Sequence, residues 1–413
     1  MKADADALVI GAGPAGAACA ILLAQAGWQV LLVEQSKFPR QKVCGECLTA
    51  AALWQLDELG VGAAVDRLAG PPLQHLRFSQ GTWNVTAAMP PCHDGPHRYG
   101  RALGRDHLDF LLAERATAVG VTRIQPARVR AVRGVPGNYV CDIEAVAGAP
   151  RVRRVPVVID AHGSWEAGPW ERGTRTARRP RRGSDLFGFK AGFLGAHLAP
   201  GVLPVLAFPG GYGGMVMAGG GRLTLAGCIR RDTLGLWRSR LPETSAGLAF
   251  EHYLRRHNRE LAGVLDGAQR LGPWMSVGPL RPGIHGEALG GPFRVGNAAA
   301  ETHPLIGEGI NMALQSAQCL AHRLVQESPH ALDDAASRNI HRDIARTWRQ
   351  AFAHRMRLAA LYARIAMHPL LALPCASLLR CHPPLLTQAA QLAGKSHRPI
   401  DCSPTVEVPH EHA

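Results

Sequence analysis

A chain of 413 residues with 46% hydrophobic and 19% charged residues is long enough for two or three domains, and its composition excludes a disordered protein. The formal net charge of +14 leaves nucleic acid, an anionic membrane surface, and anionic substrates or cofactors open as partners. Ten cysteines without regular spacing exclude a disulfide framework and predict reduced thiols in a reducing compartment.

The first predicted elements lie in segment 6–34, which reads DALVIGAGPAGAACAILLAQAGWQVLLVE. An apolar strand, a glycine turn, a small-residue helix and a second apolar strand follow one another. Gly11 permits the tight turn, Gly13 lets the backbone approach a diphosphate, and Gly16 lets the helix pack closely on the sheet. Glu34 is placed to accept hydrogen bonds from ribose hydroxyls. The segment therefore predicts a dinucleotide site at a helix N-terminus.

The next segment, 38–48, reads FPRQKVCGECL and is suited to crossing the ribityl and ring region of a flavin. A helix is predicted over 49–59. Cys44 and Cys47 form a CxxC pair, which also fits a disulfide reductase. Such enzymes need a second nicotinamide fingerprint, and no second GxGxxG follows a strand in residues 50–413, so we favour the flavin interpretation.

Another helix is predicted over 104–115, with Arg105 at its start, and strands are predicted through 121–147 and 155–163. The Gly-, aromatic- and β-branched-rich stretch 184–232 predicts an antiparallel sheet. In that stretch Phe208 and Tyr212 are candidate substrate contacts, although an aromatic residue that fills the core is an equal alternative for Tyr212.

Arginines are concentrated between residues 151 and 182, in a Pro- and Gly-containing stretch without the aromatic residues of a single-strand nucleic-acid groove. We therefore expect no nucleic acid as partner. Two interpretations of the stretch stay open: a solvated loop, and a contact with anionic lipid headgroups or an acidic carrier protein.

The segment 293–314 predicts a short strand that ends at Gly296 and Asn297, a loop through Pro304, and a helix that opens at residues 307–311. A helix start of this kind stabilises negative charge on a flavin ring. His303 is a tentative catalytic proton donor or acceptor, with a structural loop histidine as the alternative. Histidines and cysteines show no metal-ligand spacing, so no metal is expected.

Helical stretches with proline stops are predicted over 329–395, and their longest uncharged run, 365–379, is too short to span a bilayer. A helical cap on the other domains is the favoured interpretation. A surface that docks on a membrane to receive a lipophilic substrate is the alternative. The N-terminus lacks the pattern of a secretory leader, so we expect a cytoplasmic protein, with peripheral membrane contact left open.

Four of these motifs together resemble the group A flavoprotein monooxygenase superfamily, which also holds geranylgeranyl reductases and flavin-dependent halogenases. They are GAGPAG with Glu34, the loop FPRQKVCGE, the helix start at Arg105, and VGNAAAETHPLIGEGINMAL. The similarity spans most of residues 5–385. CGEC, FGFKAGF and FPGGYGG are most similar to the geranylgeranyl reductase-like branch of FAD-dependent oxidoreductases.

The resemblance implies FAD as cofactor and NAD(P)H as reductant. The cofactor-binding residues that the motifs and the resemblance together predict are Gly11, Gly13, Pro14, Ala15, Gly16, Glu34, Arg40, Cys44, Gly45, Arg105, Gly296, Asn297, Pro304, Gly307, Gly309, Ile310 and Asn311. Two positions depart from the family pattern. Asn297 stands where the family has aspartate, and the mid-chain aspartate-glycine motif reads His162-Gly163, which makes the reductant less certain than the flavin.

The resemblance predicts an α/β fold: a Rossmann-type, three-layer FAD-binding domain with a parallel sheet, a mixed or antiparallel substrate sheet, and a helical C-terminal extension. The expected FAD domain comprises residues 1–70, 98–165 and 273–328, and the substrate sheet 71–97 and 184–272. A basic loop (166–183), a helical region (329–395) and a mobile tail (396–413) complete the chain.

The favoured function is a monooxygenase that uses NAD(P)H and O2 to hydroxylate an apolar aromatic, polyketide-type or isoprenoid substrate through a flavin C4a-hydroperoxide. The alternative is a geranylgeranyl reductase-like saturase of prenyl double bonds. A halogenase is disfavoured because the chain has no WxWxIP sequence, and a flavin-bearing electron carrier is a further alternative of a different class.

Overall fold

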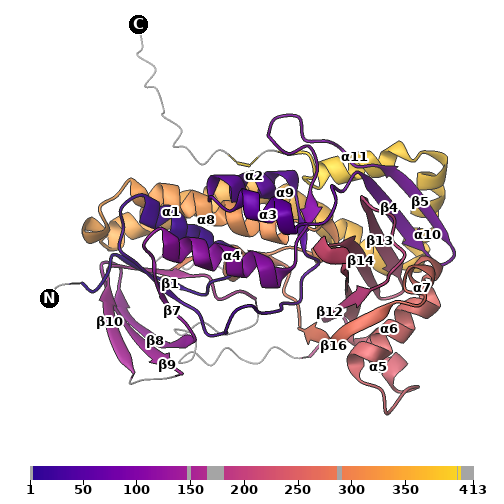
Figure 1. The fold of residues 1–413 in the computed structure, drawn as a ribbon, viewed down its shortest axis with the longest axis horizontal. Coiled ribbons are helices and arrows are strands. Elements are labelled where there is room, and N and C mark those ends of the chain that lie inside the picture. Colours follow the sequence, from indigo (N-terminus) through magenta and orange to yellow (C-terminus); the bar gives the residue numbers. More distant parts are fainter. Residues whose placement is uncertain (1–2, 147–149, 165–180, 286–290, 398, 401–413) are drawn as a thin grey trace, which may run out of the picture.

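The structure, a computed structural model, describes residues 3–146, 150–164, 181–285, 291–397 and 399–400. Two sheets lie along the long axis of the molecule, the parallel sheet toward the left of Figure 1 and a seven-stranded sheet toward the right. The arginines between residues 172 and 179 and the tail from residue 401, both considered above, lie outside the described residues.

The first sheet is parallel throughout and begins with the dinucleotide motif. In spatial order its strands are β18 (Phe293–Arg294), β11 (Val157–Asp160), β1 (Ala7–Ile10), β2 (Val30–Val33) and β7 (Thr122–Ile124). Every residue of β1 and β2 is buried. Both faces of this sheet are covered, which is why these strands are uninterrupted apolar runs rather than alternating ones.

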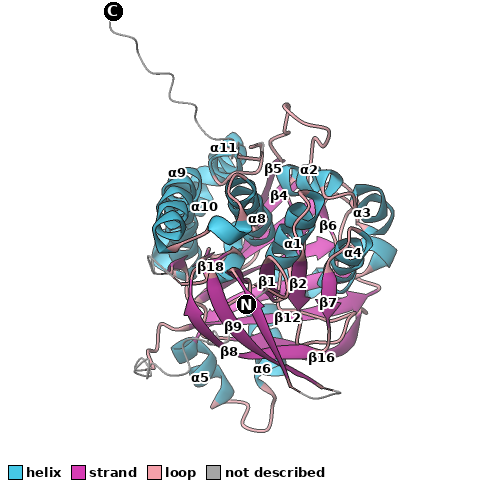
Figure 2. Ribbon diagram, turned by 90° about the vertical axis from the view of Figure 1, so that its left-hand side faces the viewer, coloured by secondary structure: helices cyan, strands magenta, loops and turns pink. Residues whose placement is uncertain are grey.

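Helices cover one face of the parallel sheet and a small antiparallel sheet covers the other (Figure 2). Val9 and Leu32 pack toward the helices, whereas their neighbours Leu8 and Leu31 pack toward the small sheet. The three-layer fold predicted from the sequence is therefore confirmed. The covering elements are α1 (Pro14–Gln25), α4 (Arg105–Ala118) and α8 (Gly309–Val325) on one side and β8 (Ala127–Val135), β9 (Asn138–Ala145) and β10 (Arg151–Val155) on the other; α2 (Ala50–Glu58) and α3 (Gly62–Leu68) join the helical layer.

The second sheet has seven strands, antiparallel except where β13 and β4 run parallel. Helices α5 (Arg231–Arg238), α6 (Ala246–His257) and α7 (Arg259–Val264) pack on one face, with Phe250 at the centre of the contact. The boundary expected at residue 272 falls inside β16, whose two ends, 269–271 and 275–277, both pair with β12. The strands in spatial order are β16 (Gln269–Val277), β12 (Leu186–Leu194), β15 (Leu223–Arg230), β14 (Gly211–Met217), β13 (Val202–Phe208), β4 (His75–Gln80) and β5 (Trp83–Ala88).

The C-terminal helices cover the other face of the seven-stranded sheet: α9 (Asp334–Met367), α10 (Pro369–Cys381) and α11 (Pro384–Leu392). Within the described part of the chain, no single helix has the length and hydropathy to cross a membrane. Only α9 and α10 together meet those measures, and they are bent by 102° at their junction. Short strands complete the fold: β3 (Cys47–Leu48), β6 (Arg101–Ala102), β17 (Gly283–Ile284) and β19 (Ala300–Glu301).

Candidate functional site

A cavity of about 680 Å³ runs between the two sheets, from the carboxyl ends of β1 and β2 to the C-terminal helices. Most of the predicted cofactor residues line it, although they come from segments nearly 300 positions apart in the chain. The lining includes Gly11, Gly13, Pro14, Ala15, Glu34, Arg40, Cys44, Gly45, Arg105, Gly296, Asn297, Pro304, Gly307, Gly309 and Ile310.

The turn between β1 and α1 has the geometry of a diphosphate cradle. Gly11 has a φ of +99°, and a Cβ there would lie 2.6 Å from the carbonyl oxygen of Ala161. A Cβ on Gly16 would lie 1.9 Å from the Gly11 carbonyl oxygen, so Gly16 allows close packing, as predicted, rather than lining the cavity. No side chain caps the first turn of α1, which leaves its N–H groups for a ligand.

Two arginines face the cradle from the other side. A Cβ built on Gly13 would lie 3.7 Å from a guanidinium nitrogen of Arg40 and 3.7 Å from one of Arg105. Asp109, one helical turn after Arg105, accepts two hydrogen bonds from it at 2.7 and 2.8 Å and lies 3.3 Å from Arg40. The Nε of Arg40 is buried without a hydrogen-bond partner in the described residues, which fits a bound phosphate or ribose oxygen.

Glu34 lies where a ribose acceptor is needed, at the end of β2, and is 2% exposed. Its carboxylate accepts hydrogen bonds from the backbone N–H of Ala12 at 2.9 Å and of Ser36 at 2.8 Å. Each carboxylate oxygen has further lone pairs for ribose hydroxyls. Glu34 therefore holds the glycine turn in place as well as facing the cofactor space.

The second predicted helix start lies at the far part of the cavity. Gly307 has the left-handed φ of +61° that ends the turn after Pro304, and α8 begins at Gly309. Asn311 is not among the residues that line the cavity; its amide donates to Glu308 at 2.7 Å and accepts from Gln315 at 2.8 Å.

The two positions that depart from the family pattern are close to each other in space. Asn297 donates a hydrogen bond to the Ser164 hydroxyl at 2.7 Å. Asp160 is fully buried and bonds both the backbone N–H and the ring Nδ1 of His162. His162, Gly163 and Ser164 line the cavity.

Cys44 and Cys47 are both free thiols that line the cavity. The Sγ of Cys44 accepts a hydrogen bond from the backbone N–H of Glu46, and burial raises the pKa of the Cys47 thiol. Lys395 approaches Cys47 Sγ at 3.8 Å. Cys319 is disulfide-bonded, so the expectation of reduced thiols throughout the chain is wrong at that residue.

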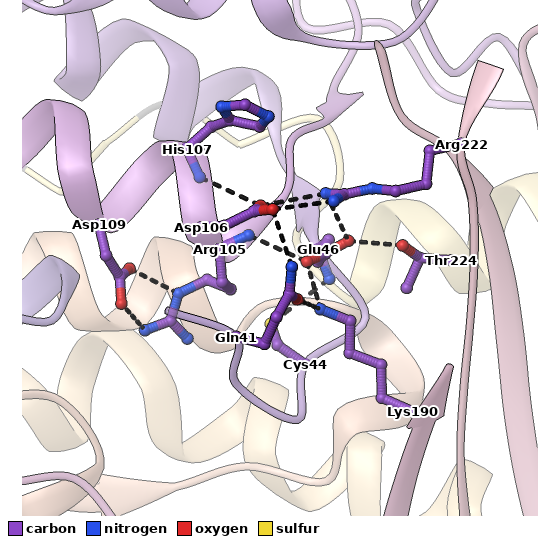
Figure 3. A network of polar contacts seen from close by, with 10 residues as sticks. All are labelled: Gln41, Cys44, Glu46, Arg105, Asp106, His107, Asp109, Lys190, Arg222 and Thr224. Atoms are coloured by element: carbon purple, nitrogen blue, oxygen red, sulfur yellow. Dashed lines mark hydrogen bonds and ion pairs between the residues drawn. The ribbon is translucent and has the colours of Figure 1, made fainter. Parts of the chain in front are cut away.

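A buried ionic network centred on Glu46 fixes the loop 41–46 against the seven-stranded sheet (Figure 3). Glu46 is fully buried and has a φ of +58°, a left-handed conformation that side chains adopt at a cost. Its carboxylate accepts hydrogen bonds from Lys190 Nζ on β12, from the Thr224 hydroxyl on β15 at 2.5 Å, and from the Arg105 backbone N–H at 2.9 Å. These bonds hold the loop beside the cavity in one conformation.

Neither Glu46 nor Lys190 was predicted from the sequence to be a site residue. Signals for both were present, since Glu46 lies inside the quoted FPRQKVCGE motif and Lys190 is a lone cation in the apolar strand LFGFKAGF. A cation in such a strand predicts a buried partner. Asp109 was also missed, although its i,i+4 spacing from Arg105 predicts an ion pair on one helix face.

The seven-stranded sheet brings one of its two candidate substrate residues to the cavity. Tyr212 lines the cavity and is 1% exposed, and its hydroxyl lies 3.1 Å from Nδ1 of His303. Phe208 instead packs against Phe250 and Tyr253 on the opposite face of the sheet and does not line the cavity.

Two titratable groups next to Tyr212 are strongly affected by burial. Burial lowers the pKa of His303 to about 4, so its imidazole is neutral at neutral pH. Burial also raises the pKa of Glu301, which lines the cavity, to about 7. Burial raises the pKa of Tyr212 well above 10, so its hydroxyl stays protonated. The cavity wall therefore offers a hydroxyl, that of Tyr212, and a carboxyl that titrates near neutral pH, while the neutral His303 does not line the cavity and contacts the Tyr212 hydroxyl from behind.

Residues 4–135 match the family model described as "FAD binding domain". The menaquinone reductase of Mycobacterium tuberculosis (strain ATCC 25618 / H37Rv) is 28% identical over 364 residues, which cover 85% of this chain and 80% of that protein. The residues that line the cavity fit FAD, because the first turn of α1 has no side-chain cap and the buried Nε of Arg40 has no partner among the described residues.

Two solved structures share the fold. The myxobacterial chondrochloren halogenase aligns with a TM-score of 0.70 and 19% identity, covering 84% of this chain and 80% of that one. A geranylgeranyl bacteriochlorophyll reductase-like protein from Thermoplasma acidophilum aligns with a TM-score of 0.66 and 17% identity, covering 94% of this chain and 99% of that one. The chain is therefore similar to FAD-dependent oxidoreductases: its residues 4–135 match an FAD-binding domain, and it shares its fold with an FAD-dependent halogenase and a geranylgeranyl bacteriochlorophyll reductase-like protein.

Proposed function

We propose that this flavoprotein is a monooxygenase that hydroxylates a lipophilic aromatic substrate carrying a phenolic hydroxyl. Bound FAD, once reduced by a nicotinamide, supplies an electrophilic oxygen atom from O2 or, in a reductase, a hydride. The protein must bind an electron-rich ring, orient it and exclude water. The observation that carries the proposal is Tyr212 in the wall of an apolar cavity, with its hydroxyl hydrogen-bonded to His303 behind the wall.

The Tyr212 hydroxyl is placed to bind a substrate hydroxyl. Because its pKa is lowered, the imidazole of His303 is neutral, and in the tautomer protonated at Nε2 the Tyr212 O–H donates to Nδ1. The Tyr212 oxygen then has lone pairs that accept a hydrogen bond from a phenolic O–H. This chain of hydrogen bonds draws the proton away from the phenol, which increases the electron density of its ring.

The wall around this pair is apolar and suits a long hydrocarbon substituent. Glycines flank Tyr212 on β14, so no neighbouring side chain shields its hydroxyl on that strand. Leu76, Leu203 and Val205 line the cavity from β4 and β13, and Leu386 lines it from α11. A phenol with an alkyl or prenyl chain matches this combination of one polar pair and an extended apolar wall.

The test uses Tyr212→Phe, which removes the hydroxyl and keeps the ring. With a long-chain alkylresorcinol as substrate, product formation should fall by about 10- to 100-fold while FAD content stays unchanged. Oxygen consumed without product should appear as hydrogen peroxide. Tyr253→Phe is the matched control, because its hydroxyl bonds Pro209 and does not line the cavity. Unchanged coupling in Tyr212→Phe would remove the pair from the mechanism.

A second candidate, reduction of a prenyl double bond, is favoured by the similarity to menaquinone reductase over 85% of this chain. A reductase needs a proton for the second carbon of the double bond, and the carboxyl of Glu301 in the cavity wall is a suitable donor. Glu301→Gln should then abolish turnover of a prenylated quinone without air. Oxygen uptake in step with product, and no product without air, would favour the monooxygenase instead.

A further inference from the structure

We propose that the outer face of α10 docks on an anionic phospholipid bilayer and that lipophilic substrate passes from the bilayer into the cavity there. The leucine face is defined by Leu370, Leu371, Leu373 and Leu378. This inference rests on the proposed function only in naming where the substrate comes from, since docking itself needs no turnover.

The leucine face is an exposed apolar surface on a helix of 13 residues. Leu370 is 87% exposed, Leu373 and Leu378 are each 53% exposed, and Leu371 is 44% exposed. The inner side of the same helix buries Ala372 and Ala376. Because leucines gathered on one helix face are costly to leave in water, this surface points to a partner that covers it.

The charge of the C-terminal helices that include the leucine face favours an anionic partner. Residues 344–395 contain seven Lys or Arg residues and no Asp or Glu. The exposed arginines of this acid-free stretch are Arg346, Arg349, Arg357, Arg364 and Arg380. A second copy of this chain would bring the same positive charge to the contact, whereas anionic lipid headgroups complement it.

The leucine face adjoins the entrance to the cavity. Leu378 is half exposed and also lines the cavity, so it lies at the rim. Cys375 and Leu379 line the cavity from the same helix, and Leu385 and Leu386 line it from α11. In Figure 1 α10 and α11 lie at the end of the molecule that holds β4, β5 and β13. A bilayer against α10 therefore lies next to an apolar route toward Tyr212.

The test is sedimentation of the FAD-loaded, full-length protein with vesicles of phosphatidylcholine alone or of equal parts phosphatidylcholine and phosphatidylglycerol. We expect the wild type to sediment with the mixed vesicles. Leu370→Ser/Leu373→Ser should weaken this binding by about tenfold or more. Neither residue lines the cavity, and flavin absorbance verifies folding. Leu236→Ser/Leu271→Ser is the matched control, with two other exposed leucines (71% and 41%).

Two double variants that remove the same charge at different places distinguish the effect of where the arginines lie from the effect of the net charge of the protein. Arg364→Gln/Arg380→Gln should weaken binding to the mixed vesicles by about 30-fold, because two interfacial cations at about 1 kcal/mol each contribute about 2 kcal/mol. Arg67→Gln/Arg238→Gln removes the same charge from exposed sites outside the acid-free stretch and should leave binding unchanged.

Three results would overturn the proposal: no sedimentation of the wild type, equal binding by the leucine variant, or a wild-type dimer in light scattering that the leucine variant converts to monomer. The last result would make the leucine face a contact between copies. Vesicle binding as expected, without hydroxylation of any alkylphenol, would reject the proposed function and leave the docking surface intact.

Discussion

Glu301 and His303 lie two residues apart, and burial shifts their protonation in opposite ways. A carboxyl whose pKa rises from 4.5 to about 7 on folding holds its proton more tightly in the folded state, so its contribution to stability is lost as pH rises through that window. His303, whose pKa falls to about 4, contributes stability that is lost as pH falls below about 6.5. The two contributions oppose each other in the wild type.

The variant Glu301→Gln should reveal how much the protonation of Glu301 contributes to the pH dependence of stability. Between about pH 4.5 and 7 the free energy of unfolding of the wild type should fall by about 3 kcal/mol relative to the variant. Urea unfolding across this range measures the difference, in which the His303 contribution cancels. Glu243→Gln, at an exposed site, serves as control. A pH-independent difference for Glu301→Gln would show that this carboxyl is not held protonated.

Gly13 gives a direct test of the diphosphate cradle. The nearest atoms to an added Cβ are guanidinium nitrogens at 3.7 Å, so the folded chain accommodates a side chain there, whereas a bound diphosphate would not. Gly13→Val should weaken FAD binding by at least about tenfold with little change in melting temperature. Gly263→Val, where nothing lies within 4 Å, is the control. Full flavin occupancy in Gly13→Val would place the diphosphate elsewhere.

Among elements, the network around Glu46 joins the loop 41–46 to β12 and β15, and its pairs are almost fully buried. Lys190→Met leaves the buried Glu46 carboxylate with only Arg222, at 3.9 Å, as a cation, which should cost about 3 kcal/mol of unfolding free energy. Adding Glu46→Gln to that variant should restore part of the loss. Arg133→Met, at an exposed pair with Asp142, should cost at most about 1 kcal/mol. Equal losses at the two sites would contradict a buried charge pair.

The helices and strands around each glycine motif could be predicted from the sequence because their geometry is set by residues close to one another in the chain. The turn at Gly11 and the packing at Gly16 depend on neighbours within a few residues. The Lys190–Glu46 pair could not be predicted in the same way, since its partners are 144 residues apart and meet only when the seven-stranded sheet docks on the FAD-binding domain.

Tyr212 lines the cavity and Phe208 does not, because the two residues lie on opposite faces of the seven-stranded sheet. Ala207 pairs directly with Tyr212 across β13 and β14, so both point to the cavity side, and Phe208, next along the strand, points to the other. The sequence could not distinguish these faces because apolar elements cover both. Helix α8 begins at Gly309, within the predicted range, and Asn311 in its first turn points toward Glu308 rather than into the cavity.

At the scale of the whole molecule, the net charge of +14 predicts how bilayer docking responds to salt. Screening lengths fall from about 10 Å at 0.1 M to about 3 Å at 1 M salt, so attraction between the acid-free stretch and anionic headgroups should weaken steeply, whereas insertion of the leucine face should not. Binding to mixed vesicles should therefore fall at high salt toward the value for phosphatidylcholine alone. In Leu370→Ser/Leu373→Ser the same salt series should abolish binding entirely. Salt-independent binding of the wild type to mixed vesicles would show that the arginines of α9 and α10 do not face the headgroups, even if the leucines do insert.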